Sequence, residues 1–267
     1  MLPKIRKLLG ARQPARPAPA VPEGQRAYAI GDIHGRNDLF TALIAAVEAD
    51  DRARGPAETT VVLLGDLIDR GADSAGVIDA AREWQRRRPV RIIMGNHEEM
   101  LLECFEDQEV LRHFLRYGGR ETLLSYPIDP DAYTRATLDE VDAMMRRAVP
   151  EADLAFIRSF ENHIAIGDYL FVHAGIRPEV ALDAQTVSDL RWIREPFLGY
   201  RGDHGCVVVH GHTIYDEPQV RANRISIDTG AYLSGTLTAL GLEGTARWLI
   251  ETHDQNGVVT ATQRSAS

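Results

Sequence analysis

Residues 59–71 read TTVVLLGDLIDRG, and this stretch decides the fold class. Its first half is β-branched and apolar, which predicts a buried strand that ends at Gly65-Asp66. Two similar units lie on either side of it in the chain, YAIGD at residues 28–32 and VRIIMGN at residues 90–96. We therefore predict three strands, each of which ends in a glycine followed by a polar residue.

Helical patterns separate these strands. Apolar residues recur at helical spacing within residues 39–47 and again within residues 76–87. An order of strand, helix, strand, helix and strand implies parallel strands that are joined by crossover helices. Residues 98–160 then look mostly helical. Short β-rich runs follow at 164–166, 169–172, 207–209, 224–227, 236–242 and 246–251.

The predicted fold class is α/β, a two-sheet β-sandwich flanked by helices. The chain has 267 residues, of which 44% are hydrophobic, and this is enough to bury a sizeable core. We expect a single domain in which residues 98–160 form a helical cover segment. The chain has only two cysteines, which cannot form a disulfide framework, and it has no run of about 18 apolar residues. We therefore predict no membrane span.

Charge is unevenly distributed along the chain. The formal net charge of -9 argues against broad binding to nucleic acid, so we predict no nucleic-acid partner. Residues 1–25 nevertheless hold five Lys or Arg residues and one acid, and residues 12–22 are rich in Pro and Ala. We predict a disordered basic N-terminal tail over 1–25 and the folded domain over 26–267. A weak tether to an acidic partner or a membrane surface is the alternative role for the tail.

The expected location is the cytoplasm, because we find neither a secretory signal nor a disulfide pattern. The sequence leaves the oligomeric state open.

Side chains capable of chemistry follow the predicted strands. The carboxyl ends of parallel strands meet at one edge of a sheet, so we expect these side chains to converge there. They offer carboxylate oxygen, imidazole nitrogen and amide oxygen without thiolate, a set that suits Mn, Fe, Zn or Mg. A carboxylate shared by two such ions gives the spacing of hydrolytic two-metal centres. The residues are Asp32, His34, Asp66, Asp69, Asn96, His97, His173, His210 and His212.

Seven segments together resemble a known family. They are GDIHGR (31–36), GDLIDRG (65–71), GNHEEM (95–100), VHAG (172–175), WIRE (192–195), HGHT (210–213) and IDTGAYLSGTLTAL (227–240). The pattern resembles the metallophosphoesterase superfamily over residues 26–242, and within it the bacterial and phage-type serine/threonine protein phosphatases. The resemblance implies the calcineurin-like metallophosphoesterase fold.

The same resemblance implies two divalent metal ions. We expect manganese, and iron, zinc, nickel, cobalt or magnesium are the alternatives. Asp32, His34 and Asp66 would bind the first ion. Asp66 would bridge to the second ion, which Asn96, His173 and His212 would complete. A water shared by the two ions would then attack phosphorus without a covalent intermediate.

The remaining roles follow from the same resemblance. His97 would protonate the leaving alkoxide, and Asp69 would hold and polarise His97. Arg70 and Arg194 would grip the phosphate oxygens with their planar guanidinium groups. Arg36 and Tyr232 are further candidates for substrate contact.

Several alternatives remain open from the residues alone. His97 could bind metal instead, and Asp69 could simply pair with Arg70. Arg191 is the rival of Arg194, because both flank Trp192. His210 could be a ligand in place of, or beside, His212. Ile214 occupies a position at which many metallophosphoesterases have a further ligand, and its side chain cannot bind a metal.

We expect a metal-dependent phosphomonoester hydrolase, specifically a serine/threonine protein phosphatase that acts on a phosphorylated protein or a small phosphoester. The alternative enzyme is a symmetric dinucleoside tetraphosphate hydrolase or another nucleotide phosphohydrolase of the same superfamily. Asp69 and Glu98 favour the protein phosphatase, since the symmetric hydrolases differ at both positions. A non-catalytic protein that binds phosphorylated partners is the alternative from another class.

Overall fold

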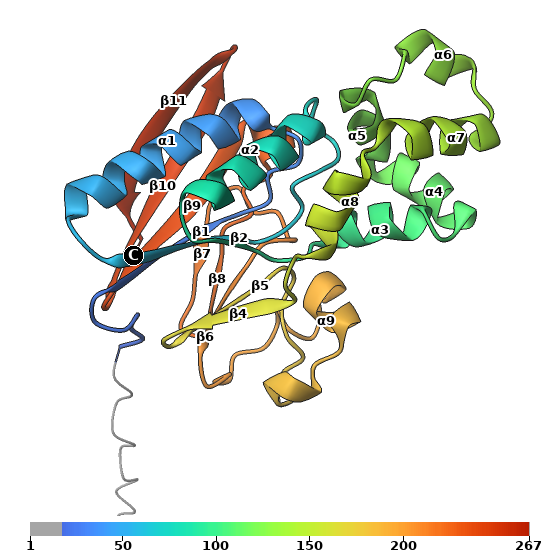
Figure 1. Ribbon diagram of the computed structural model, residues 1–267. Coiled ribbons are helices and arrows are strands. Elements are labelled where there is room, and N and C mark those ends of the chain that lie inside the picture. Colours follow the sequence, from blue (N-terminus) through green and yellow to red (C-terminus); the bar gives the residue numbers. More distant parts are fainter. Residues whose placement is uncertain (1–17, 267) are drawn as a thin grey trace, which may run out of the picture.

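The computed structural model describes residues 18–266, and these form two sheets with helices on the outside (Figure 1). The first sheet has the strand order β11-β10-β9-β1-β2-β3. Its strands are β1 (Gln25–Ile30), β2 (Glu58–Leu63), β3 (Val90–Ile92), β9 (Thr236–Glu243), β10 (Ala246–Gln255) and β11 (Val258–Ser265). Strands β1, β2 and β3 pair in parallel, which confirms the order predicted from the crossover pattern.

The second sheet has the strand order β4-β5-β6-β8-β7. Its strands are β4 (His163–Ile166), β5 (Tyr169–Val172), β6 (Val207–His210), β7 (Gln219–Val220) and β8 (Arg224–Ser226). Strands β5, β6 and β8 are parallel, so their carboxyl ends also lie at a common edge. The predicted α/β fold with two sheets is confirmed.

Apolar side chains fill the space between the two sheets. Strands alternate the faces on which their side chains lie, so every second residue contributes to this layer. From β1 the layer takes Ala27 and Ala29, whereas Tyr28 and Ile30 lie on the other face against the helices. The side chains of the second sheet also alternate between this layer and the outer face. The two-sheet sandwich therefore has a continuous core between its sheets.

Two long helices cover the outer face of the first sheet (Figure 1). Helix α1 (Asn37–Arg54) buries Leu39, Phe40, Leu43, Ile44 and Val47, which recur at helical spacing. Helix α2 (Ser74–Arg87) is capped at its N-terminus by Asp73, whose side chain accepts a hydrogen bond from the backbone N–H of Gly76. These two crossover helices leave the carboxyl ends of β1, β2 and β3 free for the loops that carry the polar motifs.

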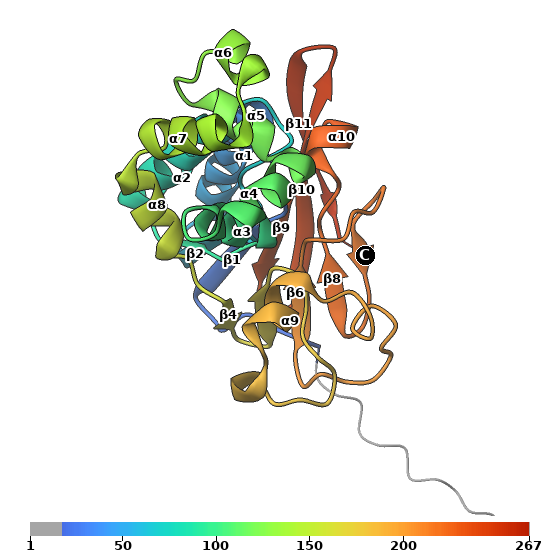
Figure 2. The same cartoon turned by 90° about the vertical axis from the view of Figure 1, so that its right-hand side faces the viewer.

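The predicted helical cover is present between β3 and β4. Its helices are α3 (Asn96–Cys104), α4 (Gln108–Phe114), α5 (Arg120–Ser125), α6 (Pro130–Arg135), α7 (Leu138–Ala148) and α8 (Glu151–Arg158), and the chain kinks between α4 and α5 at Leu115–Gly119. Figure 2 shows this group on the same side of the first sheet as α1 and α2. The buried side chains of the cover, such as Phe114 and Met145, join the same apolar cluster as those of α1 and α2.

Short elements complete the second half of the chain. Helix α9 (Val187–Trp192) and the segment that follows it cover the outer face of the second sheet, where Leu190 and Phe197 pack on Val208. The 3₁₀ turn at Leu182–Ala184 precedes α9, and α10 (Ala231–Ser234) joins β8 to β9. None of the helices in residues 18–266 is long and apolar enough to cross a membrane.

Residues 18–24 pack on the domain and lie outside its predicted boundary. Val21 is 2% exposed, and its backbone N–H donates to the carbonyl of Gly244. The backbone N–H of Ala20 donates to the Asp168 carboxylate, so this segment contacts both sheets. The boundary predicted near residue 25 therefore lies inside the packed part of the chain. The prediction of a disordered tail over residues 1–17 lies outside the described residues.

Two strands were missing from the sequence prediction. Strand β7 has only two residues, too few to show a periodic pattern. Strand β11 is mostly exposed at the edge of the first sheet, so its sequence lacks the apolar alternation of a half-buried strand.

Candidate active site

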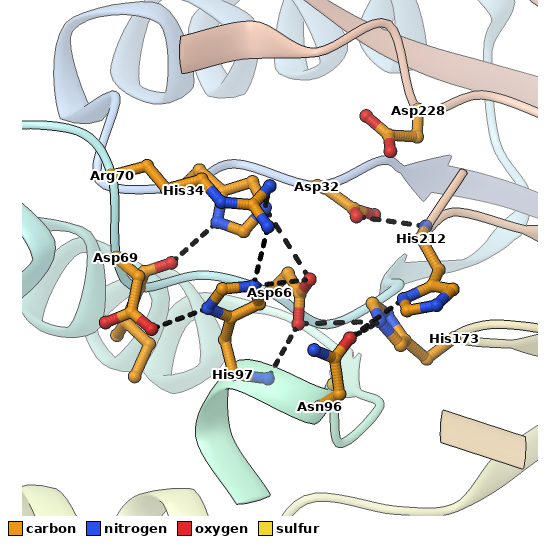
Figure 3. Close-up of polar contacts among 12 residues, drawn as sticks. Asp32, His34, Asp66, Asp69, Arg70, Asn96, His97, His173, His212 and Asp228 are labelled. Carbon is orange, nitrogen blue, oxygen red and sulfur yellow. Dashed lines mark hydrogen bonds and ion pairs between the residues drawn. The ribbon is translucent and has the colours of Figure 1, made fainter. Parts of the chain in front are cut away.

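Loops at the carboxyl ends of β1, β2, β3, β5 and β6 bring the predicted polar residues together (Figure 3). Glycines allow the close approach. A Cβ atom at Gly95 would lie 2.2 Å from Oδ1 of Asp66, and one at Gly211 would lie 1.9 Å from Oδ1 of Asp32. A side chain at Gly95 would clash with the backbone of Asp66, and one at Gly211 would displace the Asp32 carboxylate, so glycine at both positions keeps these carboxylates in place.

The site residues themselves have unusual backbone conformations. Of the seven non-glycine residues with positive φ among residues 18–266, five belong to the predicted site. They are His34 (φ 47°), Asp66 (φ 49°), Asp69 (φ 73°), Arg70 (φ 69°) and His212 (φ 62°). Left-handed backbone costs energy for residues with a Cβ atom, and such strain is concentrated at functional sites.

Two groups of potential metal ligands share Asp66. In one group, ligand atoms of His34, Asp66 and His97 lie within 4.8 Å of one another, and in the other those of Asp66, His173 and His212 do. Asp66 therefore lies where a bridging carboxylate was predicted. The first group contains His97, so the geometry keeps the alternative of His97 as a ligand.

The tautomers of two histidines are fixed by the backbone. Nδ1 of His34 donates to the carbonyl of Ile68, and Nδ1 of His173 donates to the carbonyl of Leu64, both at 2.8 Å. A carbonyl only accepts, so each ring carries its proton on Nδ1 and presents an unprotonated Nε2 toward Asp66. Neutral Nε2 is the form of imidazole that binds metals.

Asn96 lies between two of the predicted ligands. Its Oδ1 is 2.9 Å from Nε2 of His173 and 2.8 Å from Nδ1 of His212. Nε2 of His212 is buried and has no hydrogen-bond partner among residues 18–266. Nδ1 of His212 and Nε2 of His173 both face the amide oxygen of Asn96, as the ligand atoms of one shared metal ion would.

The buried carboxylate of Asp32 also has an oxygen atom without a hydrogen-bond partner among the described residues. Its Oδ2 accepts a hydrogen bond from the backbone N–H of His212, but its buried Oδ1 has no partner within the described part of the chain. Burial, together with the charges of Asp228 and Asp66, raises the pKa of Asp32 well above its ordinary value. A nearby cation would relieve this repulsion. Asp32 lies in neither ligand group above, so its predicted place in the first metal site stays a prediction.

Burial disfavours the protonated form of three histidines of the site. Burial lowers the pKa of His34 and of His173 below the ordinary value, and it lowers the pKa of His212 to about 3. Burial by itself would raise the pKa of Asp66, but the positive charges that His173, His97 and His34 carry when protonated outweigh it, so that pKa lies below its usual range. An ionised carboxylate among neutral imidazoles fits a divalent cation.

His97 and Asp69 form a buried pair. Nδ1 of His97 lies 2.6 Å from Oδ2 of Asp69, and the two residues are 1% and 0% exposed. Burial would lower the pKa of His97, but the carboxylates of Asp66 and Asp69 outweigh it, so the pKa of His97 lies above its ordinary value. The Asp69 carboxylate contacts Thr122 as well as His97, which argues against a simple ion pair with Arg70.

Arg70 lies between two histidines. Its guanidinium nitrogens are 2.9 Å from Nε2 of His34 and 2.9 Å from Nε2 of His97. Binding a metal through Nε2 of His34 would require Arg70 to turn away from that nitrogen. The ring of Tyr232 lies below the guanidinium, 4.8 Å from ring centroid to Cζ, so Tyr232 is also placed at the site.

Arg194 and its rival Arg191 have different surroundings. Arg194 is exposed and lines a cavity of about 230 Å³ over the site. Arg191 instead pairs with Glu99 at 2.5 Å and donates to Asn162. The structure therefore favours Arg194 over Arg191. The cavity is also lined by Asp66, Arg70, Asn96, His97, Met100, His113, Tyr117, Trp192 and His212.

Two other candidates lie outside this cavity. The guanidinium of Arg36 pairs with Asp38 and Asp254 and donates to the carbonyl of Ala231, so the expectation that it contacts substrate is not supported. His210 lies on the outer face of the second sheet, with its ring 5.0 Å from that of Phe197. Its ligand atoms belong to neither of the two groups around Asp66.

Sequence reasoning missed three residues of the site. Burial raises the pKa of Asp228 to about 6, and this carboxyl lies beside Asp32 (Figure 3). A signal was present, because Asp228 follows β8 in the same way that Asp32 follows β1. From the sequence alone, Glu98 was used only to choose between the protein phosphatases and the symmetric hydrolases. In the structure, its buried carboxylate accepts hydrogen bonds from the backbone N–H groups of Asp66 and Leu67. Thr122 carried no signal, since it is one threonine within a long helical stretch.

Comparison with known families gives the site a context. The family model for calcineurin-like phosphoesterases matches residues 26–235, which is most of the chain. The chain belongs to the calcineurin-like phosphoesterase family. Members of this family are metal-dependent phosphoester hydrolases, and the ligand groups around Asp66 agree with that.

Curated relatives of this phosphoesterase carry several names. It is 28% identical over 242 residues to an asymmetrical bis(5'-nucleosyl)-tetraphosphatase PrpE of Geobacillus thermodenitrificans, covering 79% of this chain and 88% of the relative. It is 29% identical over 221 residues to serine/threonine-protein phosphatase 1 of Salmonella typhimurium, covering 79% and 89%. It is 30% identical over 176 residues to a symmetrical bis(5'-nucleosyl)-tetraphosphatase of an Acidovorax species, covering 66% and 49%.

Solved structures show the same fold. A crystal structure of a candidate diadenosine tetraphosphatase aligns with a TM-score of 0.59 at 18% identity, covering 92% of this chain and 98% of that one. The cold-active protein-tyrosine phosphatase of a psychrophilic Shewanella aligns with a TM-score of 0.54 at 18% identity, covering 91% and 83%.

Proposed function

We propose that this phosphoesterase hydrolyses phosphate monoesters of alcohols, with His97 as the general acid. The buried His97–Asp69 pair carries the proposal. An alkoxide is a poor leaving group and must be protonated as it departs, which is a task for an imidazole that holds a proton near neutral pH. The Asp69 carboxylate fixes the ring through Nδ1, so the proton to be given away would be carried on Nε2. Nε2 accepts a hydrogen bond from Arg70 in this structure, so Arg70 must turn away from it when His97 holds that proton.

The metal ligands are proposed as they were predicted from the sequence. Asp32, His34 and Asp66 would hold one ion, and Asp66, Asn96, His173 and His212 the other, with manganese as the proposed metal. The unpartnered Oδ1 of Asp32 fits this assignment, as does the approach of Nε2 of His173 and Nδ1 of His212 to Oδ1 of Asn96. Two bound divalent ions would supply an activated water and neutralise charge on the phosphate.

Two arginines are proposed to bind the phosphate group. Arg70 lies beside His97 inside the cavity, and Arg194 reaches the same cavity from the segment after α9. Because each guanidinium offers a planar pair of donors, the two side chains can grip different phosphate oxygens. They would orient the leaving oxygen toward His97.

The proposed substrate is a protein phosphorylated on serine or threonine. Both residues give alkoxide leaving groups, for which the His97–Asp69 pair is useful. The similarity to the Salmonella serine/threonine-protein phosphatase supports this choice.

A second substrate class has a specific observation in its favour. Tyr117 and Trp192 are 45% and 37% exposed, and both line the cavity over the site. Exposed aromatic rings beside a phosphate site can stack on nucleobases. Two of the three curated relatives named above are dinucleoside tetraphosphatases, which favours the hydrolysis of such dinucleotides.

One comparison tests the choice of substrate. The manganese-loaded protein is assayed on a phosphoserine peptide, a phosphotyrosine peptide and diadenosine tetraphosphate at equal concentrations. The first proposal expects the phosphoserine peptide to give the highest kcat/KM. A higher kcat/KM on diadenosine tetraphosphate would favour the second substrate class, the dinucleotides. In that case Tyr117→Leu should raise KM for the dinucleotide about tenfold, while Tyr117→Phe should not. A metal-loaded protein that is inactive on all three would contradict both.

The role of His97 has its own test. His97→Ala should reduce kcat/KM on an alkyl phosphate by about a hundredfold or more, and by much less on an aryl phosphate, whose leaving group needs little protonation. His253→Ala is the control, because His253 hydrogen-bonds to threonines on the C-terminal strands and is absent from the cavity lining. Equal losses on the two substrates would contradict a general acid role.

A further inference from the structure

The hydroxyl of Thr122, in helix α5 of the cover, is fully used in hydrogen bonds around Asp69. It donates to Oδ1 of Asp69 at 2.5 Å and accepts from the backbone N–H of Asp69 at 2.8 Å. Oγ of Ser74 lies 2.9 Å away. Because Thr122 has only one hydroxyl proton and gives it to Asp69, Ser74 must be the donor in that contact. One donor and two acceptor positions are therefore all occupied.

These contacts leave the Asp69 carboxylate a single orientation. Oδ1 is bound by Thr122, and Oδ2 is 2.6 Å from Nδ1 of His97. Asp69 and Thr122 are both 0% exposed, so no solvent competes for either oxygen. The backbone of Asp69 is left-handed, with φ 73°, and needs external contacts to keep it there. Thr122 contacts both the backbone N–H and the side chain of Asp69, whereas Ser74 shares only the contact with the backbone N–H.

The cover also contacts the neighbouring residue of the same loop. The backbone N–H of Arg70 donates to the carbonyl of Gly118 at 3.1 Å. A Cβ atom at Gly118 would lie 2.6 Å from Cγ of Arg70, so the cover backbone is in close contact with this arginine. The segment from Gly118 to Thr122 therefore supports the Asp69-Arg70 pair from outside the catalytic loops.

We propose that Thr122 is a positioning residue for the general acid, in that it orients the Asp69 carboxylate which in turn holds His97 toward the leaving group. The inference rests on the proposed role of His97. The position of the helical cover over the cavity suggests that it selects the substrate. The proposed role of Thr122 gives the cover a part in catalysis as well. Rigid support of this kind is what keeps a catalytic side chain in productive geometry.

Three variants test the proposal. Thr122→Val removes the hydroxyl while keeping the shape of the side chain, and Thr122→Ser keeps the hydroxyl. Ser125→Ala is the control for the support of helix α5, because the Ser125 hydroxyl accepts from the backbone N–H of Ala75 and donates to the backbone carbonyl of Thr122 without touching Asp69. Each manganese-loaded variant is assayed on an alkyl and an aryl phosphate monoester, and thermal unfolding monitors its fold.

Thr122→Val should lower kcat/KM on the alkyl phosphate by about tenfold or more and on the aryl phosphate by less than about threefold. Thr122→Ser and Ser125→Ala should stay within about threefold of the unchanged protein on both substrates. In a His97→Ala background, Thr122→Val should leave the ratio of the two activities unchanged, because the group that Thr122 positions is gone.

Equal losses on the two phosphates in Thr122→Val, beside a normal leaving-group dependence in His97→Ala, would overturn the role of Thr122 alone. A His97→Ala variant without leaving-group dependence would overturn the proposed general acid, and this inference with it. If Thr122→Val does not fold, Thr122→Ala removes the hydroxyl without added bulk. The same ratio of activities then decides the question.

Discussion

Oε2 of Glu98 accepts a hydrogen bond from the backbone N–H of Asp66 at 2.9 Å. The same carboxylate accepts from the backbone N–H groups of Leu67 at 2.7 Å and Gly95 at 3.0 Å. Glu98 is 0% exposed. A single buried side chain therefore joins the loop after β2, which carries Asp66, to the turn at the start of α3, which carries the next polar motif.

Glu98→Gln should destabilise the fold by about 1–3 kcal/mol, because an amide NH₂ group replaces one acceptor and faces buried N–H donors. The unfolding free energy from urea denaturation measures this. Glu103→Gln, at an exposed position of the same helix, should change stability by less than about 0.5 kcal/mol. An equally small effect of Glu98→Gln would show that the contacts of its carboxylate are dispensable.

Metal binding should stabilise the protein, since its ligand set is already gathered in the folded chain. At a free Mn(II) concentration of about 100 times the dissociation constant, one site adds about 2.7 kcal/mol to the unfolding free energy. Thermal unfolding of chelator-treated protein, with and without added Mn(II), measures this. Asp66→Asn should abolish most of the shift, because Asp66 belongs to both ligand groups. An equal shift in that variant would place the metal elsewhere.

Arg194→Ala and Arg191→Ala should separate phosphate binding from structure. Arg194 reaches the cavity, so its loss should lower kcat/KM on a phosphate monoester by about tenfold or more with little change in melting temperature. Arg191 pairs with Glu99 outside the cavity lining, so its loss should affect mainly stability. Steady-state kinetics and thermal unfolding of both variants check this assignment. The reverse pattern would give the phosphate-binding role to Arg191.

Acid should weaken the contacts between α1 and β1 and β2. Burial would raise the pKa of Asp51, but hydrogen bonds from Arg26, Thr59 and Arg88 outweigh it and lower that pKa below its ordinary value. A lowered folded pKa gives stability that is complete above about pH 5 and is lost as the pH falls below about 4. The ion pair with Arg26, which is 1% exposed, should account for much of this effect.

Asp51→Asn should therefore cost about 2 kcal/mol of unfolding free energy at pH 7, and the difference from the unchanged protein should shrink toward pH 3. Urea denaturation across this pH range gives the comparison, with Asp131→Asn at an exposed position as the control. A difference that stays constant with pH would mean that ionisation of Asp51 does not contribute.

The two-sheet fold was predictable because its central strands are apolar runs that end in glycine and a polar residue. The same pattern predicted that Asp32, Asp66, Asn96, His173 and His212 would meet, since carboxyl ends of parallel strands share an edge. Motif position was enough to find these residues because each is tied to the end of a strand.

Contacts between segments far apart in the sequence were not predictable. Thr122 reaches Asp69 across 53 positions of the chain, and nothing in its local sequence distinguishes it from a solvent-facing threonine. Arg36 looked like a substrate contact from its motif, but Asp254, 218 positions away, holds its guanidinium. Such pairs form only when whole helices and strands pack together, so a local sequence pattern does not predict them.

The left-handed backbone at His34, Asp66, Asp69, Arg70 and His212 has a consequence for evolution under heat. Glycine adopts this left-handed conformation at a lower free-energy cost than the residues present, by roughly 1 kcal/mol or more at each position. Four of the five side chains are buried and have hydrogen-bond partners or belong to the proposed metal sites, whereas Arg70 is half-buried and is proposed to bind phosphate. Selection for thermostability without selection for turnover should therefore favour glycine at position 70 first, at the expense of substrate binding.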